Sequence, residues 1–494
     1  MRKIQRMVSL GLCVLLLCNL GTTHAEANSA QSRWDGKDAT GTLVAEENCP
    51  VVVEKEVLTF DIPEFPKTYY SEKEEYLSYK AKVTAEYTFY NPADYTVTAT
   101  LLFPFGNEPD YAFFDYGGAD GDEVCNTDTE KYDILVNGQP VEKKIRHSLS
   151  YRYSQFELEK DMALLHDGFM TDEFYLPDML SVTAYVYKVS GVDKQTYRAA
   201  SVAFDVKKND MKRKYYLVNQ SGFHTQKDGD ARISTWVDGS YDEMKMVLYV
   251  IGEPLSKQPE WKLYKDGGVE DGEEIAGTVT YVSQETMTLR EFALAGWSEE
   301  TGVSESDWYN AVIHEMKEDE THNSYGILSL DRYKQGLSKN LMRWYEYEIT
   351  LAPGERIVNT VTAPIYPGIV LDFDPPVYNY TYLLSPAKTW AAFLELQIVI
   401  NTPYYVVNGT GNIEGLKQTG NGYMAFIDGL PEEECEFTLS TELNPKSELG
   451  GYGAGMSKSA IKIAILVCCL GLCVLGAATN LLRGKQRKGS NMKE

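Results

Sequence analysis

The sequence is poor in cysteine, histidine and positive charge, and each shortage excludes a class of protein. Of 494 residues, 8 are cysteine and 6 are histidine. Only Cys49, Cys125 and Cys435 lie between the apolar segments near the two ends, so a dense disulfide framework is excluded. The formal net charge is −25, with 72 acidic residues against 47 basic ones. A nucleic-acid partner is therefore not expected, because its electrostatic footprint is basic.

Signatures of hydrolases and of phosphate-binding enzymes are also missing. His314-Glu315 has no second histidine four residues after the first, so it does not form a zincin helix. The sequence contains no Gly-x-Ser-x-Gly elbow and no Gly-rich phosphate loop. Cys125 and His147 could be imagined as a nucleophile and its base, but nothing in the sequence fixes their geometry. We therefore expect a protein that is not an enzyme and that has no cofactor.

Two apolar segments near the ends of the chain predict its location. Basic residues precede the short apolar run at 10–20, and small residues follow it, as in a secretory signal peptide. The apolar segment 460–482 is long enough to cross a bilayer as a helix. Four basic residues follow within 483–488, which favours a cytoplasmic tail. We expect a single-pass protein of the cell membrane with its N-terminus outside. Its few cysteines favour a bacterial, Gram-positive surface.

Alternating side chains predict β-strands through most of the chain. Apolar and polar residues alternate along Tyr79 to Tyr90, and again along Tyr95 to Phe105 after the turn residues 91–94. These two segments predict a hairpin. Asn137-Gly138 predicts a second hairpin, because these residues favour a tight two-residue turn. Helical spacing appears at 286–296 and 306–317, and Leu330 to Met342 is a further candidate helix.

The predicted fold class is mainly β, an antiparallel β-sandwich ectodomain with a small helical insertion and one C-terminal transmembrane helix. The expected organisation follows this order: signal peptide 1–25, flexible lead 26–44, N-terminal β-sandwich region 45–282, helical insertion 283–342, C-terminal β unit 343–445, Gly-rich stalk 446–459, transmembrane helix 460–482 and basic cytoplasmic tail 483–494.

Two local patterns resemble those of known bacterial proteins. One is AEYTFYNPADYTVTATLLFPFG, Ala85 to Gly106, and the other is YNYTYLLSPAKTWAAFLELQIVI, Tyr378 to Ile400. Similar pairs occur in exported or membrane-anchored bacterial proteins that have no known function. The resemblance implies β-sandwich modules on a bacterial surface and brings no catalytic residues with it.

Acidic loops and clustered tyrosines are the candidate binding features. The loops with Asp120 and Asp122, and with Asp266 and Asp271, contain the carboxylates that calcium prefers, although their spacing is not that of an EF-hand. Ordinary solvated turns also explain these loops, and we expect this second interpretation and no bound metal. Exposed aromatic side chains are typical of sugar and protein contacts, and cross-strand packing is the alternative. The candidate contact patch comprises Tyr69, Tyr70, Tyr76, Tyr404 and Tyr405.

The combined features favour a non-catalytic binding or scaffolding protein of the cell surface. Its partner would be an extracellular protein or a polysaccharide. An accessory or sensor subunit of a membrane complex is an alternative, in which the transmembrane helix would contact a membrane-protein partner. An exported enzyme is a third, and it would require a cleft with convergent carboxylates or histidines.

Overall fold

The computed structural model describes residues 39–447, apart from 41, 46–47, 106–108, 110, 112–130, 151–156, 208–211, 238–242, 268, 270–271, 323–324, 331–336 and 338–340. Within these ranges the chain is mainly β, as predicted. Among the described residues no helix is both long and apolar enough to cross a bilayer. The expected signal peptide 1–25, the transmembrane helix 460–482 and the tail 483–494 lie outside the described residues, as does the stalk after Ser447.

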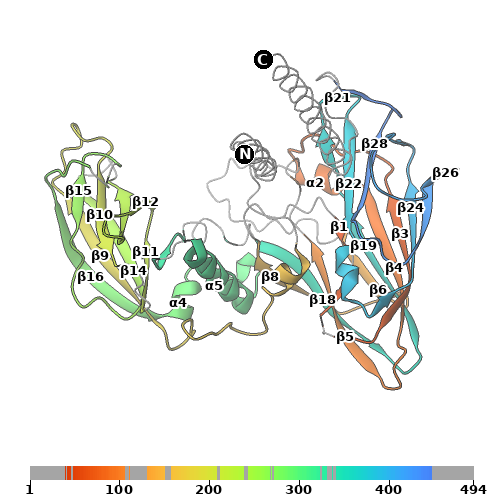
Figure 1. The fold of residues 1–494 in the computed structure, drawn as a ribbon, viewed down its shortest axis with the longest axis horizontal. Coiled ribbons are helices and arrows are strands. Elements are labelled where there is room, and N and C mark those ends of the chain that lie inside the picture. The colour runs from red at the N-terminus through yellow and green to blue at the C-terminus, as the bar shows by residue number, and fades with distance from the viewer. Residues whose placement is uncertain are drawn as a thin grey trace, which may run out of the picture.

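Three sheets enclose the first core and form what we call the larger sandwich (Figure 1). The nine-stranded sheet contains, in spatial order, β26 (Lys417–Thr419), β27 (Gly422–Asp428), β24 (Glu395–Asn401), β3 (Val52–Asp61), β4 (Lys82–Tyr90), β19 (Arg356–Pro364), β6 (Asp133–Val136) and β7 (Gln139–Pro140), with β23 (Ala392–Phe393) beside β3. The five-stranded sheet contains β1 (Ala39–Thr40), β22 (Val377–Leu383), β28 (Cys435–Ser440) and β25 (Tyr405–Val406), with β20 (Gly368–Val370) beside β22. The four-stranded sheet contains β2 (Leu43–Val44), β5 (Val97–Phe105), β18 (Leu341–Leu351) and β8 (Lys144–Leu149). A small ribbon pairs β21 (Phe373–Asp374) with β29 (Lys446–Ser447).

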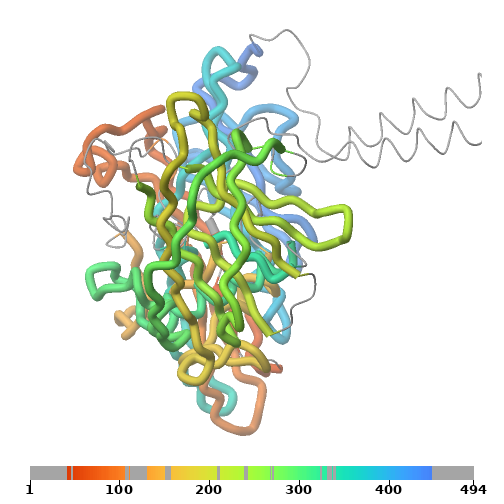
Figure 2. Tube along the Cα trace, turned by 90° about the vertical axis from the view of Figure 1, so that its left-hand side faces the viewer, coloured from red at the N-terminus to blue at the C-terminus, as the bar shows by residue number. Residues whose placement is uncertain are grey.

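Two further sheets form the smaller sandwich around a separate core. One contains β16 (Thr278–Thr288), β9 (Ser181–Ser190), β14 (Glu243–Gly252), β11 (Arg213–Leu217) and β17 (Ile327–Leu328). The other contains β12 (Gln220–Thr225), β13 (Ala231–Trp236), β10 (Ser201–Val206) and β15 (Lys262–Tyr264). The two bodies lie at opposite ends of the long axis, so the smaller one overlies the larger in the end-on view of Figure 2.

Helices occupy the space between the two sandwiches (Figure 1). The helices are α4 (Leu289–Ala293) and α5 (Glu305–His322), with the short α3 (Leu158–Met162) nearby and α2 (Lys73–Leu77) on the larger sandwich. Short 3-10 turns cover Glu299–Thr301 and Ser385–Thr389. Trp308, Val312 and Met316 of α5 are buried, as their spacing predicted, and the Ser304 hydroxyl accepts from the Asp307 amide to cap the helix.

The sheets divide the chain differently from the expected organisation. Strands β3, β4 and β5 pair with β24, β19 and β18, so the beginning and the end of the chain build one sandwich. The smaller sandwich and the helices α3, α4 and α5 are inserted between β8 and β18. The expected region 45–282 is therefore not one sandwich, and 283–342 is not an insertion between complete β units. The lead 26–44 is likewise not wholly flexible, because β1 and β2 pair with β22 and β5.

The predicted hairpin at Tyr79–Phe105 is wrong, although both strands are present. Val83, Ala85 and Phe89 are buried as the alternation predicted, but β4 and β5 belong to different sheets. The physical reason lies at Asn91, which is fully buried. Its side-chain amide donates to the carbonyl oxygens of Tyr95, Leu351 and Ala352. Asn91 therefore fixes an arch from one sheet to the other instead of a tight turn within one sheet.

Two other local predictions have clear outcomes. The Asn137-Gly138 turn is confirmed: β6 pairs with β7, and both turn residues have positive φ, 49° and 75°. The second strand, expected at Val141 to Arg146, is instead the short β7, and β8 pairs with β18. The helix expected at 286–296 is shorter, because β16 continues to Thr288 and a capping box between Thr288 and Glu291 starts α4 there. A third helix was expected at Leu330 to Met342. Its last two residues, Leu341 and Met342, instead begin the strand β18.

A buried carboxyl group lies inside the larger sandwich. Glu56 of β3 is 1 % exposed and lies close to the hydroxyls of Tyr87 and Tyr382. The Tyr382 hydroxyl donates to Oε1 over 3.4 Å, and Oε2 has no hydrogen-bond partner within the described part of the chain. Burial raises the pKa of Glu56 to about 7, against an opposing effect of the tyrosine hydrogen bonds. The core therefore contains an acid that is mostly protonated below pH 7 and mostly ionised above it.

An ionic cluster joins the larger sandwich to α5. Arg146 of β8 donates from Nε to Asp307 Oδ1 over 3.1 Å and from Nη1 to Glu346 Oε2 over 2.7 Å. Asp307 lies in the first turn of α5 and also accepts from the His147 amide over 2.8 Å. Burial raises the pKa of Asp307, although Arg146 opposes this effect. This cluster fixes the helix against the four-stranded sheet.

Candidate functional site

A groove of about 610 Å³ opens at one end of the larger sandwich. Its floor begins where β3 and β24 end side by side, and the backbone pairs Asp61 with Asn401. The Asn401 side-chain amide donates to Asp61 Oδ1 over 2.8 Å. The pairing of these two parallel strands thus places a carboxylate and an amide next to each other, although 340 positions separate them in the sequence.

The hairpin between β26 and β27 forms one wall of the groove. Asn401 also pairs with Gly422, at the start of β27. Gly422 has φ of 144°, and a Cβ added there would lie 1.9 Å from the Ile400 carbonyl oxygen. Only glycine permits this close approach of the hairpin to β24. Gln418 of β26 and Asn421 of the turn are polar residues of the lining.

Stacked aromatic rings support Tyr404 in the lining. The Tyr404 ring lies 3.9 Å from that of Phe65, which in turn lies 3.7 Å from that of Tyr378, with interplanar angles of 17° and 7°. The Tyr404 hydroxyl is hydrogen-bonded to the Phe65 backbone, and burial raises its pKa despite that bond. Tyr404 is therefore held in one orientation by its neighbours. Because the ring is already fixed before binding, a ligand that contacts it would cost less side-chain conformational entropy.

Two more tyrosines complete the aromatic lining. Tyr405 is 45 % exposed, so its ring is available to a ligand. Tyr423 is half-buried, and its hydroxyl accepts from the Val406 amide over 3.1 Å. The groove thus combines aromatic surface with the amides of Asn401, Gln418 and Asn421 and the carboxylate of Asp61; the remaining lining residues are Ile62, Pro63, Thr402, Pro403, Thr419, Gly420 and Gly422.

Among the described residues that line the groove there is neither lysine nor arginine, and Asp61 is the only carboxylate. An anionic ligand would meet a negative charge without a compensating cation. A neutral ligand with many hydroxyl groups would find both hydrogen-bond donors and acceptors. Acid–base catalysis by paired carboxylates would need a second acid, which these lining residues lack.

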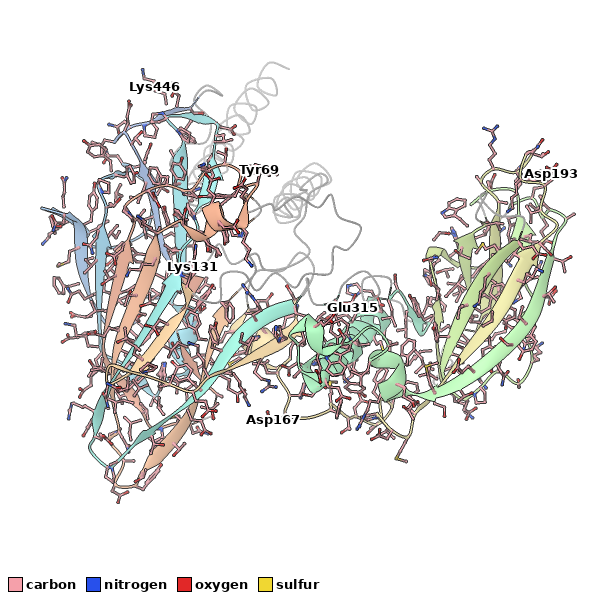
Figure 3. All side chains as sticks on the ribbon, turned by 180° about the vertical axis from the view of Figure 1, so that it is seen from behind. Tyr69, Lys131, Asp167, Asp193, Glu315 and Lys446 are labelled. Atoms are coloured by element: carbon pink, nitrogen blue, oxygen red, sulfur yellow. The ribbon has the colours of Figure 1, made fainter. Side chains whose placement is uncertain are left out.

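The structure separates the five predicted contact tyrosines. Tyr404 and Tyr405 line the groove, whereas Tyr69 is 52 % exposed beside α2 (Figure 3) and is not among the lining residues. The prediction is wrong for Tyr70 and Tyr76, which are 4 % and 0 % exposed. Their rings pack edge to face at 5.6 Å, and Tyr76 also stacks on Tyr366 at 5.5 Å. These two rings are part of the core.

The acidic loops considered as alternative calcium sites are described only in part. Among the described residues, no group of three or more histidine, cysteine, aspartate or glutamate side chains could hold a metal ion. Asp266 is described and half-buried, and its backbone carbonyl accepts from the Ser201 hydroxyl over 2.7 Å. Asp120, Asp122 and Asp271 lie outside the described residues. His147 is buried, and Cys125 also lies outside the described residues.

Sequence reasoning missed Asp61, Asn401, Gln418, Asn421 and Tyr423. The turn Thr419-Gly420-Asn421-Gly422 is a readable hairpin signal, because glycine and asparagine favour such turns. That signal could have placed Gln418 and Asn421 at a loop tip. The neighbouring position of Asp61 could not be read, since nothing local in the sequence indicates that β3 and β24 pair.

Comparison with known proteins adds little to this geometry. No family model matches the sequence, and no curated protein matches it. One solved structure, described as a "putative nutrient binding protein" from Legionella pneumophila, aligns with 81 % of this chain and 70 % of its own, at 8 % identity and a TM-score of 0.25. A likeness at that score carries no argument about fold or function.

Proposed function

We propose that this chain is a non-catalytic binding protein of the bacterial cell surface and that its groove holds a segment of a neutral polysaccharide. The observation that carries the proposal is the composition of the groove: its described lining residues combine tyrosine rings with amides and one carboxylate, and none of them is a cation. Sugar rings present apolar C–H faces to aromatic side chains and hydroxyl groups to amides and carboxylates. A nucleic acid or another polyanion would be repelled by Asp61 and by the net charge of −25.

The location of the protein is part of this proposal. The signal peptide expected at 1–25 and the apolar segment 460–482 support export followed by retention in the membrane. Protease added to intact protoplasts should then remove the region between these segments and leave a fragment with the basic tail 483–494. Full protection of that region would contradict a surface location.

Calorimetric titration with neutral hexasaccharides of glucose, xylose, mannose and N-acetylglucosamine tests the ligand. At least one should bind, and Tyr405→Ala should weaken that binding at least about fivefold, because an exposed ring at the centre of a contact contributes on the order of 1 kcal/mol or more. Tyr69→Ala is the matched control, because Tyr69 is equally exposed but lies outside the groove lining. Binding that is absent for all four sugars, or equal in both variants, would refute the proposal.

A further inference from the structure

The free edge of β16 differs from every other sheet edge in the described part of the chain. β16 is 11 residues long and pairs with β9 on one side from Thr278 to Thr288. No other described strand pairs with its outer side, and Figures 1 and 3 show it along the outer margin of the smaller sandwich. Its side chains are exposed without interruption from Thr280 to Thr286, on both faces of the strand.

The other edges are short or covered. The remaining edge strands β26, β7, β1, β25, β2, β15 and β17 have two or three residues each, and β7 contains Pro140. The edge strand β8 is covered by α5 through the Arg146–Asp307 pair. The edge strand β12 has 6 residues, against 11 in β16. Natural sheets protect their edges with short strands, proline, lysine or irregular pairing, because an open edge pairs with other strands.

The sequence of β16 carries little of that protection. TVTYVSQETMT contains no proline, glycine, lysine or arginine, and Glu285 is its only charged residue. Its register with β9 shifts once, between Tyr281 and Ser283. Threonine, valine and tyrosine favour extended pairing. The outer side thus offers a long row of backbone donors and acceptors beside side chains that suit a further strand.

The side chains of β16 are also compatible with those of a second, antiparallel copy of the same strand. If two copies pair antiparallel about a twofold axis at Ser283, Thr278 lies opposite Thr288 and Thr280 lies opposite Thr286. Val279 then faces Met287, and Val282 faces Gln284. Glu285 faces Tyr281, so no two like charges are opposed. Threonine pairs of this kind already occur on the inner side of β16, where the hydroxyls of Thr183 and Thr286 lie 3.3 Å apart.

From this edge and its symmetry we propose that two copies of the chain associate through β16, antiparallel about Ser283, so that their five-stranded sheets become one continuous sheet. The contact is isologous, and it closes after two copies because each β16 has only one free side. The net charge of −25 on each copy opposes the approach, so association strengthens as salt screens it. This proposal is independent of the groove and its ligand.

Crosslinking of the full-length chain, in a mild detergent with 0.5 M sodium chloride, tests the contact. Ser283→Cys places one thiol from each copy at the twofold axis, so mild oxidation should give a covalent dimer on non-reducing gels. Ser221→Cys is the matched control, because Ser221 is an exposed serine on β12, an edge strand of the other sheet. We expect at least fivefold more dimer for Ser283→Cys than for this control and for the unmodified chain. Equal yields would overturn the proposal.

Charge complementation tests the register. Ser283→Lys alone and Ser283→Glu alone should each sediment as monomers, because like charges meet at the axis. A mixture of the two should sediment as a dimer at the same total concentration, because lysine then faces glutamate. Melting temperatures within a few degrees of the unmodified chain would show that both variants are folded. Failure of the mixture to restore the dimer, or dimers in the single variants, would overturn this pairing. A chain that stays monomeric at about 100 µM would overturn the contact itself.

Discussion

Replacing Glu56 by glutamine should stabilise the larger sandwich above neutral pH. The pKa of Glu56 rises from its ordinary value of 4.5 to about 7 on folding, because burial disfavours the charge. Below pH 4.5 Glu56 carries its proton in both the folded and the unfolded chain. The folded state then bears no cost from a buried charge, so its stability is fully present. Between pH 4.5 and 7 the unfolded chain loses that proton while the folded chain keeps it, so stability falls as the pH rises. Above pH 7 the loss is complete.

The size of the effect follows from the same pKa. Each pKa unit corresponds to about 1.36 kcal/mol, so the ionised carboxyl costs the folded state about 3 kcal/mol above pH 7. Glutamine has nearly the same shape and no charge. The free energy of unfolding of the Glu56→Gln variant should therefore exceed that of the unmodified protein by up to about 3 kcal/mol at pH 8.5 and by little at pH 4.5.

Urea denaturation at pH 4.5, 6 and 8.5, followed by tryptophan fluorescence, measures this difference. Glu54→Gln is the matched control on the same strand. Glu54 accepts from Arg356 over 2.7 and 2.8 Å, and these hydrogen bonds lower its pKa. Its stabilising effect is present above pH 4.5 and is lost as the pH falls, so Glu54→Gln should destabilise slightly at pH 8.5. Equal stability differences for Glu56→Gln at all three pH values would refute the reasoning.

Three further predictions concern single substitutions, and urea denaturation, melting temperature or sugar titration measures each of them. Gly422→Ala should destabilise the protein by at least about 2 kcal/mol and abolish sugar binding, because its Cβ would lie 1.9 Å from the Ile400 oxygen. Gly420→Ala is the control for stability alone: its Cβ would meet no atom within 4 Å, so the free energy of unfolding should hardly change. Asp307→Ala should lower the free energy of unfolding by about 3 kcal/mol, because it leaves the buried Arg146 without its main helix partner. Asp167→Ala is the control: it removes a partner of Arg146 that is 95 % exposed, and it should cost less than about 0.5 kcal/mol. Phe103→Asp should prevent stable folding, because Phe103 is 3 % exposed in the core of the larger sandwich; a melting temperature like that of the unmodified chain would contradict this placement.

Local patterns in the sequence predicted individual strands and helices well. The alternation around Val83 and Ala99 identified buried faces, and Asn137-Gly138 identified a hairpin, because these signals depend only on residues close in the chain. Which strands pair was not predictable in the same way. The arch at Asn91 looks like a hairpin turn in the sequence, and only the carbonyls of Tyr95 and Leu351 around its amide distinguish the two.

The candidate site shows the same division between local and distant information. Tyr404 and Tyr405 were identifiable as neighbouring aromatics, and the Gly-Asn-Gly turn marks a loop. Tyr70 and Tyr76 gave the same aromatic signal, yet Tyr76 is fully buried against Tyr366, which lies 290 positions later. Exposure of a tyrosine depends on such distant partners, so the pattern alone could not separate core rings from groove rings.

The insertion between β8 and β18 fixes the order in which the two bodies can form as the chain leaves the ribosome. Strand β4 ends at Tyr90, and its partner β19 begins only at Arg356. At about 5–20 residues per second, roughly 13–53 s separate their appearance. All nine strands of the smaller sandwich emerge within that interval, up to β17 at Leu328. The body encoded in the middle can thus be finished first, while β3, β4 and β5 wait with open edges. During that time the nascent chain needs protection for its earliest strands, and we expect a holding chaperone to bind there.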